Sequence, residues 1–314
     1  MRRFILRRLF TLAVTLFFVS VLVFVVIRVL PGDPALIIMG TEGSPEAAAR
    51  LREAMGLDRP IPVQYVEWVA GAIVGDFGRS IQYDFPVGQL ILSRLPVTVP
   101  LTIMAATFMA VAAIPLGIYA ASRHRRWGDY AAMTLSQVGI AIPAFWAGLL
   151  LILLFSVRLG WVRAGGFEGW GEGIWPAFVS LALPASALGL FQFAVLTRTT
   201  RSAVLEVLRE EYVKTARAKG LPEASVLVKH AGRNAMIPVI TVVGVQLGQL
   251  LAGSIILESV FTLPGLGRLA LGAISARDLP VVQGVVLFVA SLIVIINATV
   301  DILYGVLDPR IRYG

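Results

Sequence analysis

Long uncharged stretches alternate with charged ones along the chain. Six of the uncharged stretches are long enough to cross a bilayer, which takes about 20 apolar residues of helix. They are Leu9–Ile27, Leu95–Ser122, Tyr130–Val157, Gly173–Thr197, Asn234–Leu257 and Leu279–Val300. Because backbone groups in lipid must hydrogen-bond within the protein, each stretch is predicted to be a helix. The alternating strands of roughly ten residues that build membrane barrels are not seen. The pattern predicts an all-α polytopic membrane protein with six transmembrane helices.

The distribution of positive charge predicts the orientation of these helices. If the N-terminus is cytoplasmic, 17 of the 27 Lys and Arg residues fall on the cytoplasmic side, and eight of those lie in residues 198–233. Cytoplasmic loops are enriched in Lys and Arg, so both termini are predicted to be cytoplasmic. The first span has the basic start of a secretory signal, but its apolar run is too long and no A-x-A site follows. We therefore expect a retained anchor.

Composition supports a membrane protein and excludes several functions. Hydrophobic residues make up 57% of the 314 residues and charged residues 15%, whereas soluble proteins carry about 25% charged residues. The net charge of +8 then reports topology and contact with lipid, and binding to nucleic acid is not expected. The absence of cysteine excludes disulfides, thiol catalysis and iron–sulfur clusters. His124 and His230 fall in different polar stretches, so no metal site is predicted.

The chain divides into three parts by this pattern. Residues 1–30 form an N-terminal arm and the first transmembrane helix, residues 31–94 an external segment, and residues 95–314 a core with five transmembrane helices. Within the external segment, Ser44-Pro45-Glu46 is typical of a helix start and Gly56 of a helix end. A second helix, Pro62 to Val74, is expected either to lie on the bilayer surface or, as we favour, to pack on the other helices.

The cytoplasmic connection 198–233 has amphipathic character. Helical spacing predicts one helix from Val204 to Lys219, with Leu205, Leu208, Tyr212 and Ala216 on one face. Gly220 is predicted to end that helix and Pro222 to start another. Two interpretations remain open from spacing alone. The connection either lies on anionic lipid or docks into a groove of a cytoplasmic partner.

Several sequence strings resemble one family of membrane proteins along essentially the whole chain. EYVKTARAKGL at 211–221 and KHAGRNAMIPVI at 229–240 resemble the cytoplasmic "EAA" loop of ABC-importer permeases. The other similar strings are LPGDPA at 30–35, GDFGRS at 75–80, RLPVT at 94–98, IPAFWAGLLL at 142–151, ESVFTLPGLGRL at 258–269, RDLPVVQG at 277–284 and VDILYGVLDPRIRY at 300–313. The chain is thus similar to the B-type permeases of dipeptide and oligopeptide importers. It departs from the general pattern where Lys214-Thr215-Ala216 replaces Glu-Ala-Ala and where the downstream Ile-Pro, at Ile237-Pro238, comes later.

The resemblance implies a type I ABC importer permease fold in the bacterial cytoplasmic (inner) membrane. It implies four kinds of partner: a second homologous permease (C-type), two cytoplasmic ATPase subunits, an external substrate-binding protein and membrane lipid. The chain has no G-x-x-x-x-G-K-[ST] motif, so ATP and Mg are expected on the ATPases, with no cofactor and no catalytic residue in this chain. The residues implied to contact the ATPase are Leu208, Glu211, Tyr212, Thr215, Ala216, Arg217, Lys219, Gly220 and Leu221.

Polar residues in the later spans are candidates for the substrate pathway. The candidates are Gln246, Gln249, Glu258, Asn297 and Asp301. Intramembrane ionisable groups are functional hypotheses by default, and a polar, weakly selective path would suit peptides, which share backbone amides. The alternative is that the amides, with Gln137 and Gln192, hydrogen-bond between helices.

Other functions remain as alternatives. The same importer class carries nickel chelates, glutathione or oligosaccharides, and nothing in the sequence separates these cargoes. An autonomous secondary transporter would need acids in mid-membrane and repeated halves, and neither is evident here. The expected function is therefore that of a permease for di- and oligopeptides, without enzymatic activity of its own.

Overall fold

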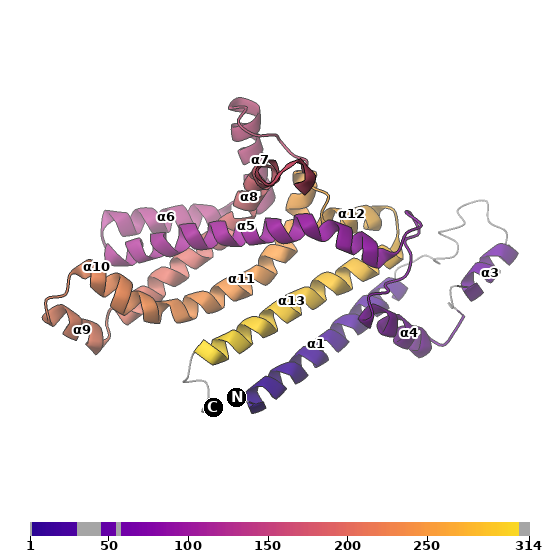
Figure 1. Cartoon of the computed structure of the whole chain (residues 1–314), viewed down its shortest axis with the longest axis horizontal. Helices are drawn as coiled ribbons and strands as arrows, with labels where there is room; N and C mark the ends of the chain where they lie inside the picture. The colour runs from indigo at the N-terminus through magenta and orange to yellow at the C-terminus, as the bar shows by residue number, and fades with distance from the viewer. Residues whose placement is uncertain (1, 30–44, 55–57, 308–314) are drawn as a thin grey trace.

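The computed structural model describes residues 2–29, 45–54 and 58–307 as an elongated bundle of helices (Figure 1). Among these residues, five helices are long and apolar enough to cross a membrane. They are α1 (Arg2–Val29), α5 (Val87–Ser122), α8 (Ile174–Val207), α11 (Arg233–Val260) and α13 (Leu279–Leu307). A sixth candidate span is formed by α6 (Trp127–Ala141) together with α7 (Ala144–Leu151) and its continuation η2 (Ile152–Arg158). The six predicted spans are thus found as helices, with five unbroken and one bent.

The third predicted span, Tyr130–Val157, is broken rather than continuous. Its two halves meet at an angle of 101°, and α7 leaves the bundle steeply (Figure 1). Pro143 at the break has no N–H, and its ring excludes a helical carbonyl four residues earlier. Ile142 before it is extended, with φ −91° and ψ 118°, as the residue before a proline prefers. Pro100, Pro115, Pro184 and Pro238 remain inside their helices.

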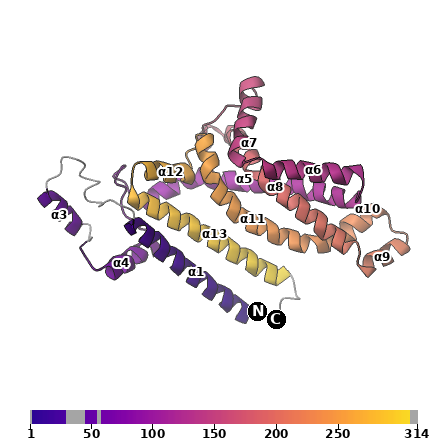
Figure 2. The same ribbon diagram turned by 180° about the vertical axis from the view of Figure 1, so that it is seen from behind.

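The bundle core forms where α5, α8 and α11 pack together, as seen from both sides in Figures 1 and 2. Leu101, Leu181 and Leu250 are all at most 1% exposed and belong to one apolar cluster. Small residues let the helices approach closely. A Cβ on Gly117 of α5 would lie 2.6 Å from Thr200 Cβ of α8, so this crossing leaves no room for a larger residue.

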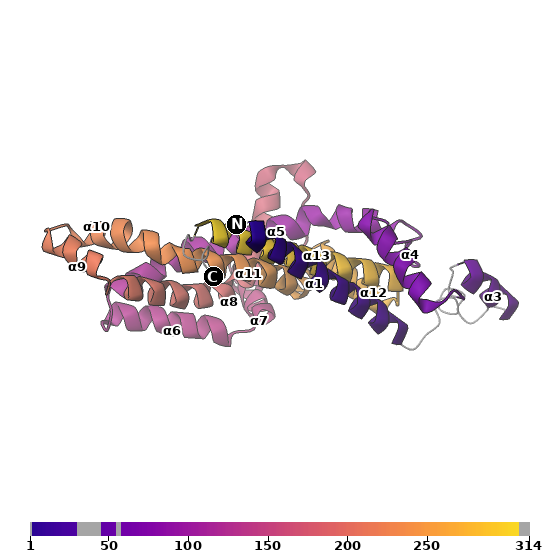
Figure 3. The same ribbon diagram turned by 90° about the horizontal axis from the view of Figure 1, so that it is seen from below.

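Helix α1 lies along α13 at the edge of the bundle (Figure 3), where Arg8 and Asp301 form an ion pair of 3.1 Å. Helix α4 (Ile61–Ile73) packs on α1 through Tyr65, whose hydroxyl lies 2.7 Å from that of Ser20. Phe24 stacks against Trp68 of α4 at 5.9 Å between ring centroids. The favoured prediction for residues 62–74, that they pack on the other helices, is therefore confirmed.

The boundaries of other elements differ from the sequence pattern. Helix α5 begins at Val87, so residues 87–94 of the predicted external segment are helical. Helix α3 (Pro45–Ala54) matches the first predicted external helix, but its proposed caps, Ser44 and Gly56, lie outside the described residues.

The predicted single helix Val204–Lys219 is wrong. Helix α8 continues from the membrane to Val207, and a separate helix, α9, spans Glu211–Ala218. The backbone turns at Leu208–Glu210, and Glu210 is extended with ψ 145°. Glu211 then lies in the first turn of α9, where an acid is favoured by the helix dipole. Helical spacing alone could not reveal this turn, because both pieces keep the same period.

The second predicted helix of the connection merges with a span. It starts after Pro222 as α10 (Glu223–Ser225), continues through a π-helical stretch, η4 (Val226–Gly232), and becomes α11 without a break. The connection therefore projects only α9 and its flanking turns beyond the long helices, at the end of the bundle seen at the left of Figure 1. We call this the α9 end, and the opposite end, which carries the short helix α12 (Leu266–Ser275), the α12 end.

Candidate functional site

Helix α9 is attached to the bundle by a small apolar cluster. Val213 and Ala216 are buried against Val226 of η4, with Val207 and Leu208 packed beside them. One turn of α9 separates Val213 from Ala216, so these two positions form its inner face. The remaining residues of α9 are exposed.

Most residues predicted to contact the ATPase lie on the exposed surface of α9 and the turn after it. They are Glu211, Tyr212, Thr215, Arg217, Lys219, Gly220 and Leu221, whereas Leu208 and Ala216 hold α9 in place from within. Tyr212 is 41% exposed, and its hydroxyl accepts a hydrogen bond of 2.7 Å from the Asn234 amide at the start of α11. The structure thus brings these residues together in α9 and the turns on either side of it.

Charged pairs set the electrostatics of this element. Lys214 pairs with Glu211 at 2.7 Å, and Arg217 pairs with Glu223 at 2.6 Å. The hydrogen bond between Arg217 and Glu223 lowers the pKa of the Glu223 carboxyl and raises that of the guanidinium. Both side chains are substantially exposed, so the pair contributes at most about 1 kcal/mol. The surface that α9 presents is therefore charged and readily rearranged.

Gly220 is essential to the geometry of the turn after α9. Its φ is +77°, a left-handed conformation that strains residues with a Cβ. Its N–H bonds the Arg217 carbonyl at 2.9 Å, and the Leu221 N–H bonds that of Ala216 at 3.4 Å. Such bonds close the C-terminus of a helix and direct the chain back toward Pro222.

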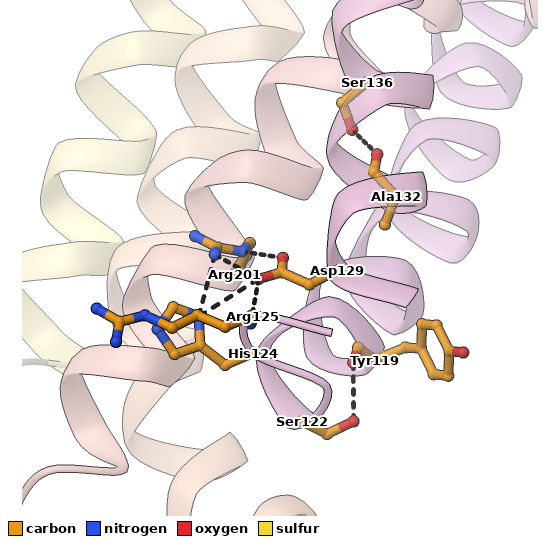
Figure 4. Close-up of polar contacts among 8 residues, drawn as sticks. All are labelled: Tyr119, Ser122, His124, Arg125, Asp129, Ala132, Ser136 and Arg201. Carbon is orange, nitrogen blue, oxygen red and sulfur yellow. Dashed lines mark hydrogen bonds and ion pairs between the residues drawn. The ribbon is translucent and has the colours of Figure 1, made fainter. Parts of the chain in front are cut away.

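A buried ion pair near the base of α9 was missed in the sequence pattern. Asp129, at 3% exposed, accepts two bonds from Arg201 of α8, at 2.5 and 2.7 Å. It also accepts the Arg125 N–H at 3.0 Å and lies 3.3 Å from His124 Nδ1 (Figure 4). Bidentate pairs of this kind are among the stronger polar contacts. The pair fixes the turn between α5 and α6 to α8, the helix from which α9 is suspended.

The candidate pathway amides contact each other between helices. Gln192 Nε2 of α8 donates to Gln249 Oε1 of α11 at 2.8 Å, and Gln246 Nε2 donates to the Gln192 carbonyl at 3.4 Å. Within the described residues, the side-chain oxygens of Gln192, Gln246 and Asn297 have no hydrogen-bond partner. Gln249 is exposed, whereas Gln192 and Gln246 are buried.

Glu258 lies apart from these amides, at the α12 end, and is fully buried. Its carboxylate accepts the Thr98 hydroxyl at 2.6 Å and the N–H of Gly267 at 2.7 Å. Because Gly267 lies in the first turn of α12, the carboxylate binds the N-terminus of that helix. A Cβ on Gly265 would lie 2.2 Å from the Glu258 carboxyl carbon. Glu258 therefore positions α12.

Asp278 is a second buried carboxylate at the α12 end. It binds the Ser80 hydroxyl, and it accepts the N–H of Ile81 at 3.2 Å and of Gln82 at 3.1 Å. These contacts join GDFGRS at 75–80 to RDLPVVQG at 277–284, as Glu258 joins RLPVT to ESVFTLPGLGRL. The two carboxylates thus bring these strings together in pairs at one end of the bundle.

Asn297 and Asp301 share a face of α13 but have different neighbours. Asp301 pairs with Arg8 of α1, and Asn297 lies near Gly248 of α11, whose Cβ position is 3.5 Å from Asn297 Oδ1. The five predicted pathway residues thus do not form one cluster. Within the described residues, no group of three or more His, Cys, Asp or Glu side chains could hold a metal ion.

The described residues thus form an apolar helical bundle that carries an exposed, charged helix at one end. Residues 113–313 match the family "Binding-protein-dependent transport system inner membrane component", and residues 1–102 match the N-terminal model of such membrane components. The chain belongs to this family, which makes it a multi-pass inner membrane permease subunit of an ABC importer.

Two relatives are similar to this chain along their full length. A relative in Brucella abortus (strain 2308), named "Putative peptide transport system permease protein", is 44% identical over 100% of both chains. The "Glutathione transport system permease protein" of Escherichia coli (strain K12) is 43% identical, also over 100% of both. A solved chain of the MetNI methionine ABC transporter matches with a TM-score of 0.58 at 17% identity, over 70% of this chain and 97% of that chain. This last likeness supports the fold alone.

Proposed function

We propose that the chain forms half of the translocation pathway of an ATP-driven importer for di- and oligopeptides. Its partners are a second homologous permease, two cytoplasmic ATPase subunits that bind ATP and Mg, and an external substrate-binding protein. The observation that carries this proposal is helix α9, which presents most of the EYVKTARAKGL string on an exposed surface at one end of the bundle. The α9 end then faces the cytoplasm, with both termini.

Helix α9 acts as the coupling element in this proposal. Tyr212, Thr215 and Arg217 are exposed on it, and Lys219, Gly220 and Leu221 form the turn that follows. A helix with a small buried face and a charged outer face suits a groove in a partner. Closure of the ATPase pair would push α9 against Leu208 and α8, and so rock the bundle between two arrangements.

The pathway is proposed to follow α11 and its neighbours. Gln249 is exposed, so its amide is the best placed for cargo, and Gln246, one turn away and buried, would hold α11 against α8. Glu258, which positions α12, and the residues Asn297 and Asp301, which join α13 to its neighbours, would act by holding the helices that line the path.

Peptides are the favoured cargo, and glutathione is the second candidate. The Brucella relative is named a peptide permease, which supports peptides, and the Escherichia coli relative is named a glutathione permease, which supports glutathione. Glutathione is itself a tripeptide. The permease would contribute to the choice through the amides that it offers, while the binding protein would select the cargo before transport.

The proposal is tested by purifying the tagged chain from its native host in mild detergent and identifying what accompanies it by mass spectrometry. We expect a second six-span permease and two P-loop ATPases, with ATPase activity stimulated by the loaded binding protein. Recovery of the folded chain without an ATPase in several detergents would contradict the coupling role of α9. The ligand extracted from the binding protein would separate peptide from glutathione.

A further inference from the structure

A pocket of about 310 Å³ lies at the break between α6 and α7. It is lined by both sides of the break (residues 140–144), by Leu188, Phe191 and Gln192 of α8, and by Gln249, Leu250 and Gly253 of α11. Most of this lining is apolar, and the two amides are its polar side chains. Gln192 lies near the middle of α8 and Gln249 just past the middle of α11. The break and the amide pair therefore meet at mid-bundle.

The break leaves polar backbone groups at this depth. The last carbonyls of α6 and the first N–H groups of α7, at Ala144, Phe145 and Trp146, have no partner within their own helices. Pro143 has no N–H, so the helical hydrogen bonds of α6 do not continue into α7. The first regular hydrogen bond of α7 runs from the Ala147 N–H to the Pro143 carbonyl at 2.9 Å. Free backbone groups at membrane depth are tolerated only where they are buried in protein or line a water-filled cavity.

The amide pair supplies a second, independent sign of a polar ligand. Gln192 is only 7% exposed, and within the described residues its Oε1 accepts no hydrogen bond. Its Nε2 is held by Gln249 at 2.8 Å, which fixes the orientation of the amide. A buried acceptor without a donor is unfavourable unless water or a ligand satisfies it.

We propose that this pocket is a binding subsite for a main-chain amide of the cargo as it crosses the membrane. Gln192 Oε1 and the terminal carbonyls of α6 would accept the N–H of a peptide bond, and the first N–H groups of α7 would donate to its carbonyl. The site thus offers acceptors and donors together and recognises what all peptides share, independently of their side chains. This inference rests on the proposed peptide transport.

Access to the pocket is tested with single cysteines, since the chain has no cysteine of its own. Ala141→Cys and Ala144→Cys line the break, and Val111→Cys, on α5 and 69% exposed, is the control that does not line the pocket. The full complex in nanodiscs is treated with a charged methanethiosulfonate reagent during ATP turnover, with and without binding protein loaded with trialanine. We expect the two break cysteines to be modified at least about tenfold faster than the control, and trialanine to slow their modification.

Recognition is tested by transport of radiolabelled trialanine and glutathione into proteoliposomes. Loss of one hydrogen bond corresponds to about a tenfold change, so Gln192→Leu should lower peptide transport about tenfold. Gln283→Leu, a half-buried amide on α13 that does not line the pocket, should leave it unchanged. Equal ATPase stimulation in both variants would confirm that the complexes are assembled.

The outcomes separate the two proposals. If the wild-type complex transports peptide but Gln192→Leu transports equally well, or the break cysteines react no faster than Val111→Cys, the subsite is wrong and the transport function stands. If the wild-type complex transports neither trialanine nor glutathione, the peptide function itself is overturned, and the subsite as a peptide site with it.

Discussion

Helices α12 and α9 are both short helices that connect long ones, at opposite ends of the bundle. Helix α12 buries five of its ten residues, whereas α9 buries two of its eight. The N-terminus of α12 is bound by the buried Glu258 carboxylate, whereas that of α9 has no side-chain cap. Two helices of similar length are thus attached differently: α12 through a buried carboxylate and a larger buried face, and α9 through a small apolar face.

The difference shows that the short helices at the two ends of the bundle are attached with different strength. A buried carboxylate that binds a helix N-terminus is costly to displace, because its charge would lose every partner that compensates for burial. The cluster under α9 contains only a few aliphatic side chains, and exposed ion pairs add little. Helix α12 is therefore held more firmly in the bundle than α9 is.

The largest effect is expected for Glu258→Ala. The substitution leaves the Thr98 hydroxyl and the N–H groups of α12 without their acceptor, so the free energy of unfolding should fall by about 4 kcal/mol. Thermal unfolding of the purified chain in detergent, followed by tryptophan fluorescence, measures the change. Glu258→Gln keeps one acceptor and should lose less. A loss below about 1 kcal/mol, the size of an ordinary substitution, would show that α12 is not braced by this carboxylate.

Asp129→Asn tests the same comparison at the α9 end of the bundle. Asp129 is buried, but Arg201 reaches solvent (21% exposed), so the uncompensated guanidinium can be partly hydrated and the loss should be about 2 kcal/mol. Helix α9 should stay folded while the turn between α5 and α6 becomes more accessible to protease. Arg201→Lys keeps the charge without the bidentate geometry. Its free energy of unfolding should therefore lie between that of Asp129→Asn and that of the wild type. An unchanged protease pattern would contradict the role assigned to the pair.

Gly220→Leu should separate stability from coupling. A Cβ in the left-handed conformation costs about 1 to 2 kcal/mol, and the strain is confined to the turn after α9. The melting temperature of the bundle should barely change, while ATPase stimulation in the reconstituted complex should fall. Gly220→Asn, which tolerates this conformation, is the matched control and should retain stimulation. Unchanged stimulation in Gly220→Leu would mean that the turn does not set the position of α9.

The smallest effect is expected for Glu223→Gln, below about 0.5 kcal/mol, because the pair with Arg217 is exposed. The pKa of Glu223 is lowered in the folded protein. Its stabilisation is therefore present above the ordinary carboxyl pKa and is lost as the pH falls through the lowered value. The difference in unfolding between wild type and variant should vanish at acid pH. A difference that persists there would show that the side chain acts by packing and not by charge.

The long helices could be predicted from the sequence because membrane depth imposes one simple requirement, a charge-free stretch of sufficient length. The break at Pro143 and the turn at Leu208–Glu210 could not, since proline is also accepted inside α5 and α8, and helical period persists across a turn. The buried carboxylates were hidden for another reason. Glu258 stands only at the boundary of an uncharged stretch, and its partner Thr98 is 160 residues away, a proximity that a single sequence does not reveal.

The candidate site divides in the same way. The residues predicted to contact the ATPase were selected together because they form one short string, and the structure places most of them on one exposed surface. The Asp129–Arg201 pair was missed because its members lie 72 residues apart and each looked like an ordinary charge beside the membrane. The signal available was Asp129 itself, an acid among arginines at the start of an uncharged stretch.

The contacts of Ser80 and Thr98 can form only late in synthesis. Their carboxylate partners, Asp278 and Glu258, emerge from the ribosome 198 and 160 residues later. Until then the nascent chain holds the first part of its α12 end open, with polar groups that must be satisfied by water or by the insertion machinery. A chain truncated before residue 258 would lack both carboxylates, so this end of the bundle is completed only when the last part of the chain has been made.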